Sequence, residues 1–103
     1  MVLIVMTTVP NAVEADSLAA GIVAKGLAAC VQIVPQMKSI YLWEGSVQTD
    51  SEQLLLIKTL QKNFDGLSKF IEANHSYAVP EIIAIDAEQV SGQYLAWMND
   101  SIG

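Results

Sequence analysis

The chain has 103 residues, of which 52% are hydrophobic and 16% are charged, and its formal net charge at pH 7 is −6. This size predicts a single domain over residues 1–103, and the apolar content excludes an intrinsically disordered chain. All five basic residues are lysine. An acidic chain without the bidentate guanidinium of arginine is a poor candidate for binding nucleic acid or an anionic membrane.

The first predicted element is a strand over residues 2–8, a continuous β-branched and apolar run. No basic segment precedes it, so Met1–Pro10 is interpreted as a strand and not as a signal peptide. No apolar run reaches the roughly 18 to 20 residues of a membrane span. The single cysteine, Cys30, cannot form an internal disulfide, and the expected location is the cytoplasm with no membrane partner.

A helix is predicted from Asn11 to about Lys25. Asn11 followed by Glu14 is an Asn-headed capping box, in which each side chain bonds a free N–H at the helix start. Gly26 fits the left-handed position after the last turn. Apolar residues at helical spacing form one stripe: Ala15, Leu18, Ala19 and Ile22.

Two long strands are predicted next, over residues 28–43 and about 46–59, with a turn around Trp43–Gly45 and a bulge or edge position at Pro35. Roughly fourteen residues span about 45 Å, whereas a chain of this length has a radius of gyration of about 13 Å. The hairpin is therefore expected to project beyond the rest of its own chain.

The second of these strands is apolar on both faces. Leu54 and Leu56 point one way, while Leu55 and Ile57 point the other. One face can take the helices of the same chain, and the other needs a cover, because a bare projecting ribbon is prone to aggregate. We expect that cover to be another copy of the chain.

The remaining elements are a helix over about Phe64–Asn74, a short strand over Ile82–Ile85 and a last helix that Ser91 can cap. Met98 and Trp97 lie on that last helix, and packing alone accounts for Trp97. The order β-α-β-β-α-β plus a terminal helix is the split βαβ pattern. The sequence therefore predicts an α+β, ferredoxin-like fold with a long central hairpin and an extra C-terminal helix.

Four segments of the chain form a recognisable series: Gly26–Gln32, Ser39–Gly45, Ile57–Thr59 and His75–Ile83. In this order and spacing they resemble the CutA divalent-cation tolerance family over nearly the whole chain. At three positions the sequence departs from the usual residues: Ser46 replaces a basic residue, and Ser76 and Ala78 stand within a run that usually reads His-Pro-Tyr-Glu.

The resemblance implies a homotrimer with interlocked hairpins. It also implies an association with tolerance to copper and other divalent metals, with no established reaction and no organic cofactor. The function expected is therefore that of a non-catalytic, metal-binding tolerance protein. The alternative is a trimeric small-ligand sensor or interaction module with intersubunit pockets, by analogy with the nitrogen-regulatory PII proteins, which share this domain and assembly.

Cys30 and His75 are the candidate metal ligands, because they are the only soft or borderline side chains apart from methionine. Structural zinc takes four ligands, so the expectation is a weak, partly open Cu²⁺ site that residues of two chains complete. Each residue also has a structural interpretation. Cys30 can be a small buried hydrophobe, and a protonated His75 can interact with a helix dipole.

An intersubunit pocket is predicted from Trp43, Lys58, Tyr77 and Glu81. A lysine in the apolar run Leu54–Leu60 is costly to bury without a partner. Lys58 either reaches water from the strand end, pairs with Glu81 or another carboxylate, or receives an anionic ligand. The aromatic residues are expected to be core or interface anchors.

Other classes with this topology or size are excluded by missing residues. An acylphosphatase needs an arginine, and a metallochaperone needs a paired-cysteine loop. A serine or cysteine hydrolase needs a base beside its nucleophile, and nothing places His75 beside Cys30. No enzymatic activity is expected.

Overall fold

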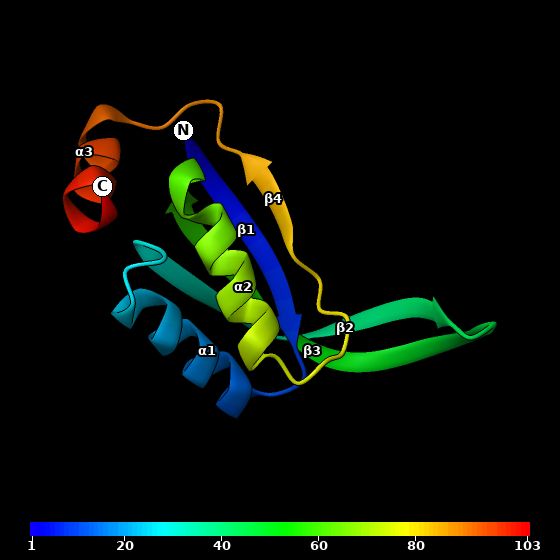
Figure 1. Ribbon diagram of the computed structural model, residues 1–103. Helices are drawn as coiled ribbons and strands as arrows, with labels where there is room; N and C mark the ends of the chain where they lie inside the picture. The colour runs from blue at the N-terminus through cyan, green and yellow to red at the C-terminus, as the bar shows by residue number, and fades with distance from the viewer.

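Four strands form one antiparallel sheet in the computed structural model, which describes residues 1–103, and two helices cover one of its faces (Figure 1). The sheet order is β2-β3-β1-β4. This is the ferredoxin-like α+β fold that the sequence predicted. The elements are β1 (Val2–Val9), α1 (Ala12–Ala24), β2 (Cys30–Trp43), β3 (Ser46–Leu60), a 3₁₀ turn (Gln61–Asn63), α2 (Phe64–Asn74), β4 (Ile83–Asp86) and α3 (Gly92–Ile102).

Helix α1 begins as the capping pattern predicted, but only half of the capping box forms. The Glu14 N–H donates to Asn11 Oδ1 at 2.8 Å. The Glu14 carboxylate does not turn back to Asn11 and instead accepts a hydrogen bond from the Ser76 N–H. At the other end, Gly26 has the left-handed φ of 69° expected after the last turn.

The β2–β3 hairpin extends well beyond the helices (Figure 1). Its two-residue turn, Glu44 and Gly45, has φ of 50° and 81°, the left-handed values that a tight hairpin requires. The register shifts between Val34 and Met37, so the bulge predicted at Pro35 is confirmed. The molecule measures 45 × 25 × 23 Å, and the projecting hairpin is the reason for its elongation.

The side chains of β1 and β3 alternate between the two faces of the sheet. Those of Leu55 and Ile57 are completely buried beneath α1 and α2, while Leu54 and Leu56 on the other face are half-buried. This alternation agrees with the prediction. The core between the helices and the sheet consists of Leu3, Val5, Val9, Ala15, Leu18, Ile22, Ala28, Leu55, Ile57, Leu67 and Ile71.

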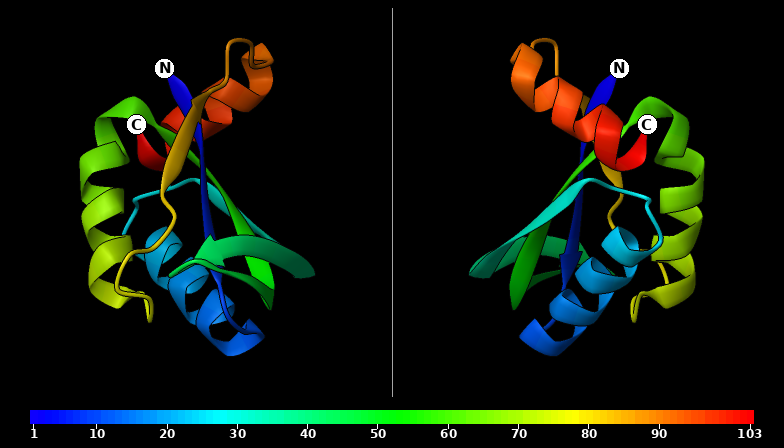
Figure 2. Two further views of the ribbon diagram at one scale, coloured as in Figure 1. Left: turned by 90° about the vertical axis from the view of Figure 1, so that its right-hand side faces the viewer. Right: turned by 90° about the vertical axis from the view of Figure 1, so that its left-hand side faces the viewer.

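The opposite face of the sheet is covered only at one end, where α3 lies (Figure 2). There Met98 packs on Val2 and Leu60 in a second, smaller cluster. The rest of this face, which we call the uncovered face, has no helix over it and meets α3 only at its border, where Lys58 lies beside Tyr94. It is formed by Ile4, Met6, Cys30, Gln32, Val34, Leu54, Leu56, Lys58, Ile83 and Ile85.

Two further findings concern the helices. Trp97 on α3 is 46% exposed, so packing within the chain does not account for it as the sequence had suggested. Its ring lies 5.3 Å from that of Tyr94. None of the helices combines the length and the apolar composition that crossing a membrane requires.

Candidate functional site

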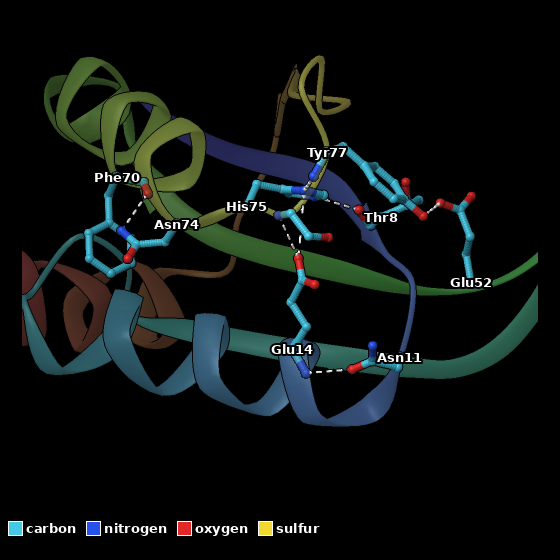
Figure 3. A network of polar contacts seen from close by, with 9 residues as sticks. Thr8, Asn11, Glu14, Glu52, Phe70, Asn74, His75 and Tyr77 are labelled. Atoms are coloured by element: carbon cyan, nitrogen blue, oxygen red, sulfur yellow. Dashed lines mark hydrogen bonds and ion pairs between the residues drawn. The ribbon is translucent and has the colours of Figure 1, made fainter.

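His75 anchors the segment between α2 and β4 to the end of β1 (Figure 3). Its Nε2 lies 2.7 Å from the Thr8 carbonyl oxygen, and its Nδ1 lies 3.0 Å from the Tyr77 nitrogen. A carbonyl only accepts and an amide N–H only donates, so Nε2 carries the hydrogen and Nδ1 accepts. This role differs from the helix-dipole contact of a protonated ring that the sequence suggested.

Glu14 ties the same segment to the start of α1 (Figure 3). Its Oε2 accepts the Ser76 N–H at 3.0 Å and lies 3.7 Å from His75 Nδ1. Residues separated by more than sixty positions in the chain therefore meet at the ends of β1, α1 and α2. These hydrogen bonds hold the start of the segment that carries His75, Tyr77 and Glu81 against β1 and α1.

Two tyrosine–carboxylate pairs lie along the projecting hairpin, Tyr77–Glu52 at its base and Tyr41–Asp50 nearer its tip. The Tyr77 hydroxyl donates to Glu52 at 2.7 Å, and the Tyr41 hydroxyl donates to Asp50. Glu52 is only 8% exposed. Burial, followed by the hydrogen bond to Glu52, raises the pKa of Tyr77, and the hydrogen bond to Asp50 raises the pKa of Tyr41. Both phenols therefore stay protonated as donors well above neutral pH.

Lys58 lies on the uncovered face and forms no ion pair within the chain. Its ammonium nitrogen is 5.6 Å from the centre of the Tyr94 ring, in a cation–π contact with α3. The pairing with Glu81 that the sequence left open is thus absent within one chain. Lys58 is half-buried, so it neither pairs with a carboxylate nor extends fully into water.

The two candidate metal ligands lie at separate places. Cys30 is opposite Lys58 on the neighbouring strand, whereas His75 contacts Thr8, whose partner on β3 is Leu54. Along β3, Lys58 and Leu54 are four residues, or about 13 Å, apart. No group of three or more His, Cys, Asp and Glu side chains in the chain converges at metal-binding distances. Cys30 and His75 therefore cannot meet within one subunit.

The four predicted pocket residues are not gathered together in one chain either. Trp43 is 57% exposed at the tip of the hairpin, and Glu81 is exposed between α2 and β4. Lys58 lies on the inner strand β3 near its C-terminal end, and Tyr77 donates a hydrogen bond to Glu52. If these residues form one pocket, they do so between subunits.

Asp50 and Glu52 are polar residues that the sequence reasoning missed, and Tyr41 was expected only as a core or interface anchor and not as a hydrogen-bond donor to Asp50. A two-residue turn at Glu44–Gly45 places Tyr41 opposite Gln48, so Asp50, two residues further along β3, is its diagonal neighbour on the same face. Counting back from the turn could therefore have found the first pair. The Tyr77–Glu52 contact joins distant segments and leaves no comparable local signal.

The fold and the arrangement of its segments define a ferredoxin-like α+β protein with an extended central hairpin. The sequence profile of the CutA1 divalent ion tolerance protein family matches residues 3–101. The chain belongs to this family. The family is named for tolerance and not for a reaction.

Relatives and solved structures agree with this assignment. The Divalent-cation tolerance protein CutA of Thermus thermophilus is 42% identical over 100 residues, which is 97% of each chain. A solved structure of the divalent cation tolerance protein Cut A1 from the same organism superposes with a TM-score of 0.96 over the whole of both chains, at 42% identity. Protein CutA 1, chloroplastic, of Oryza sativa is 46% identical over 96% of this chain, but the chain spans only 56% of that plant protein.

Proposed function

We propose that this protein works in divalent-cation tolerance as a non-catalytic homotrimer that binds Cu²⁺ or a similar ion weakly. The observation that carries the proposal is the family match over residues 3–101. A cytoplasmic location is part of the same proposal, although one relative is named chloroplastic and another periplasmic.

The uncovered face supports the trimer. Ile83 and Ile85 are each about half exposed there, beside the half-buried Leu54 and Leu56. At the tip of the hairpin, Ile40, Leu42 and Val47 are all at least 66% exposed. The apolar residues of the uncovered face are neighbours across β4, β1 and β3. A contiguous apolar patch is unusual on a monomer and is typical of an interface.

The metal site that we propose draws on Cys30 and His75 from different subunits. Cys30 lies on the face that assembly would cover, and its thiolate is a soft ligand. His75 has both ring nitrogens engaged, so a metal would compete with the Thr8 carbonyl or the Tyr77 amide. That competition is a physical reason to expect weak binding.

Calorimetric titration with Cu²⁺ tests the site. We expect Cys30→Ala to weaken Cu²⁺ binding by about tenfold or more, because a ligand atom is lost, and His75→Ala to weaken it as well. Met37→Ala is the matched control, since it removes another sulfur that is not a proposed ligand. If Cys30→Ala and His75→Ala bind copper as the parent does, both residues are structural and the site is wrongly placed.

A second candidate function is that of a small-ligand sensor with intersubunit pockets formed by Trp43, Lys58, Tyr77 and Glu81. The observation that favours it is the absence of an ion pair to the Lys58 ammonium within the chain. Quenching of tryptophan fluorescence distinguishes the two candidates. A sensor of anions would respond to small anions at the Lys58 pocket and not to Cu²⁺.

A further inference from the structure

The charges on the uncovered face are few and segregated. Three neighbouring stretches of the sheet contain one charged side chain between them, and it is Lys58 on β3. The stretches are β1, residues Leu54–Leu60 of β3 and residues Cys30–Val34 of β2. Asp50 and Glu52 lie on β3 at even positions like Lys58, so alternation places their side chains on the same side of the strand. One face thus carries a lone cation at one end and two carboxylates at the other.

These opposite charges cannot meet within one chain. Lys58 and Glu52 are six residues apart on a continuous strand, which corresponds to about 20 Å. The partners of the two carboxylates are the neutral hydroxyls of Tyr77 and Tyr41. A phenol supplies a hydrogen bond and no positive charge. The two carboxylates therefore have no partner of opposite charge within the chain, and neither does the Lys58 ammonium.

Covering the apolar face would bury all of these groups further. A charge removed from water without a partner is strongly destabilising, whereas a partner of opposite sign offsets much of that cost. Two copies of this chain can be turned so that the Lys58 end of one meets the Asp50–Glu52 end of the next. In that orientation both kinds of charge gain a partner of opposite sign. Such a head-to-tail contact closes into a ring when each copy is rotated by a fixed angle.

We propose that Lys58 of each subunit pairs with the Asp50 and Glu52 carboxylates of the neighbouring subunit. The contact fixes the orientation in which the apolar faces assemble. This inference rests on the homotrimer proposed above. Asp50 is the more accessible carboxylate, because it is exposed while Glu52 is buried against Tyr77.

Charge reversal tests the pair. Lys58→Glu and Asp50→Lys each place like charges opposite one another, and the double variant restores opposite charges. We expect each single variant to raise the dissociation constant of the assembly by about tenfold or more, and the double variant to recover most of that loss. The measurement is light scattering across a urea series, since urea leaves charge pairs unscreened, unlike guanidinium salts.

Two control variants isolate the ion pair. Lys69→Glu makes the same charge change at an exposed position on α2 and is expected to leave assembly unchanged. Tyr41→Phe removes the hydroxyl that Asp50 accepts from without changing any charge, and it is also expected to leave assembly unchanged. Circular dichroism checks that every variant is folded.

The outcomes separate this inference from the assembly itself. A parent protein that scatters as a monomer overturns the homotrimer and the ion pair together. A trimeric parent whose double variant is no more stable than the singles overturns the ion pair alone. A Lys58→Glu trimer as stable as Lys69→Glu does the same and leaves Lys58 available to an anionic ligand.

Discussion

Two threonine side chains are completely buried on the helix-covered side of the sheet, and only one has a hydrogen-bond partner. The Thr59 hydroxyl donates to the Leu27 carbonyl at 2.7 Å. The Thr7 hydroxyl has no partner. A buried hydroxyl without a hydrogen bond loses its hydration and gains nothing in return.

Thr7→Val is therefore expected to stabilise the protein by about 1 kcal/mol. Valine keeps the branched shape, removes the unpaired oxygen and suits a strand. Urea unfolding followed by circular dichroism measures the change. Parent and variant are compared at one protein concentration, because assembly makes stability depend on concentration.

Thr59→Val is the matched control, since it makes the same replacement on the same side of the sheet. It leaves the Leu27 carbonyl without its donor, and we expect a loss of about 1 kcal/mol. The two variants are thus expected to change the free energy of unfolding in opposite directions, and this difference in sign is what the experiment tests. Equal effects of the two variants would mean that the Thr7 hydroxyl is hydrogen-bonded in solution.

The residue contacts divide into those that the sequence could predict and those that it could not. Asn11 and Glu14 are three positions apart, and the predicted bond from the Glu14 N–H to Asn11 is present. The Glu14 carboxylate bonds Ser76 instead, 62 positions away. The spacing of residues along the chain predicts hydrogen bonds to backbone groups at a helix end. It does not predict which distant group a side chain will bind, because that partner is brought near only by the tertiary fold.

At the scale of elements, the predictions from periodicity and turn residues agree closely with the structure. Helix α2 spans Phe64–Asn74 as expected, and β4 begins one residue later than predicted. These segments are specified by patterns that repeat within a few residues. The position of α3 across the end of the uncovered face was not predicted, because its packing on Val2 and Leu60 joins the two ends of the chain.

The hairpin turn gives a test at this scale. Gly45 has φ of 81°, and a Cβ added there would meet nothing within 4 Å. Gly45→Ala therefore carries only the conformational cost of a side chain in the left-handed region, about 1 kcal/mol. We expect the urea midpoint to fall accordingly, because the turn sets the register of β2 and β3.

Gly92→Ala provides the comparison. An added Cβ there is equally free of contacts, but Gly92 has no left-handed φ and lies at the start of α3. Alanine favours a helix over glycine, so this variant should be neutral or slightly stabilised. A Gly45→Ala protein as stable as Gly92→Ala would show that the turn is not held in the left-handed conformation.

At the scale of the whole molecule, the sequence suggested candidate site residues but not how they are arranged relative to one another. Cys30, Lys58 and Trp43 lie on one hairpin, while His75, Tyr77 and Glu81 lie on a later segment. Within one folded chain Cys30 lies opposite Lys58 and His75 contacts Tyr77, but the six residues do not meet at one place. Sequence patterns describe contacts within a chain, and contacts between copies depend on surfaces that form only after folding.

Leu56 offers a direct test of whether the uncovered face is the interface. It is half-buried on that face, whereas its neighbour Leu55 points into the core. In the proposed trimer, Leu56→Asp would place a carboxylate among apolar side chains of another copy, where a charge without a partner is strongly disfavoured. We expect a folded monomer by circular dichroism and light scattering, and Cu²⁺ binding that falls by about tenfold or more because a shared site is lost.

Val13→Asp is the control, since it adds the same charge on the outer face of α1, where Val13 is 80% exposed. An acidic residue in the first turn of a helix is tolerated or favourable, so this variant should remain a trimer and bind copper as the parent does. A trimeric Leu56→Asp protein would exclude the uncovered face as the interface. A folded Leu56→Asp monomer that binds copper undiminished would place the metal site within one subunit.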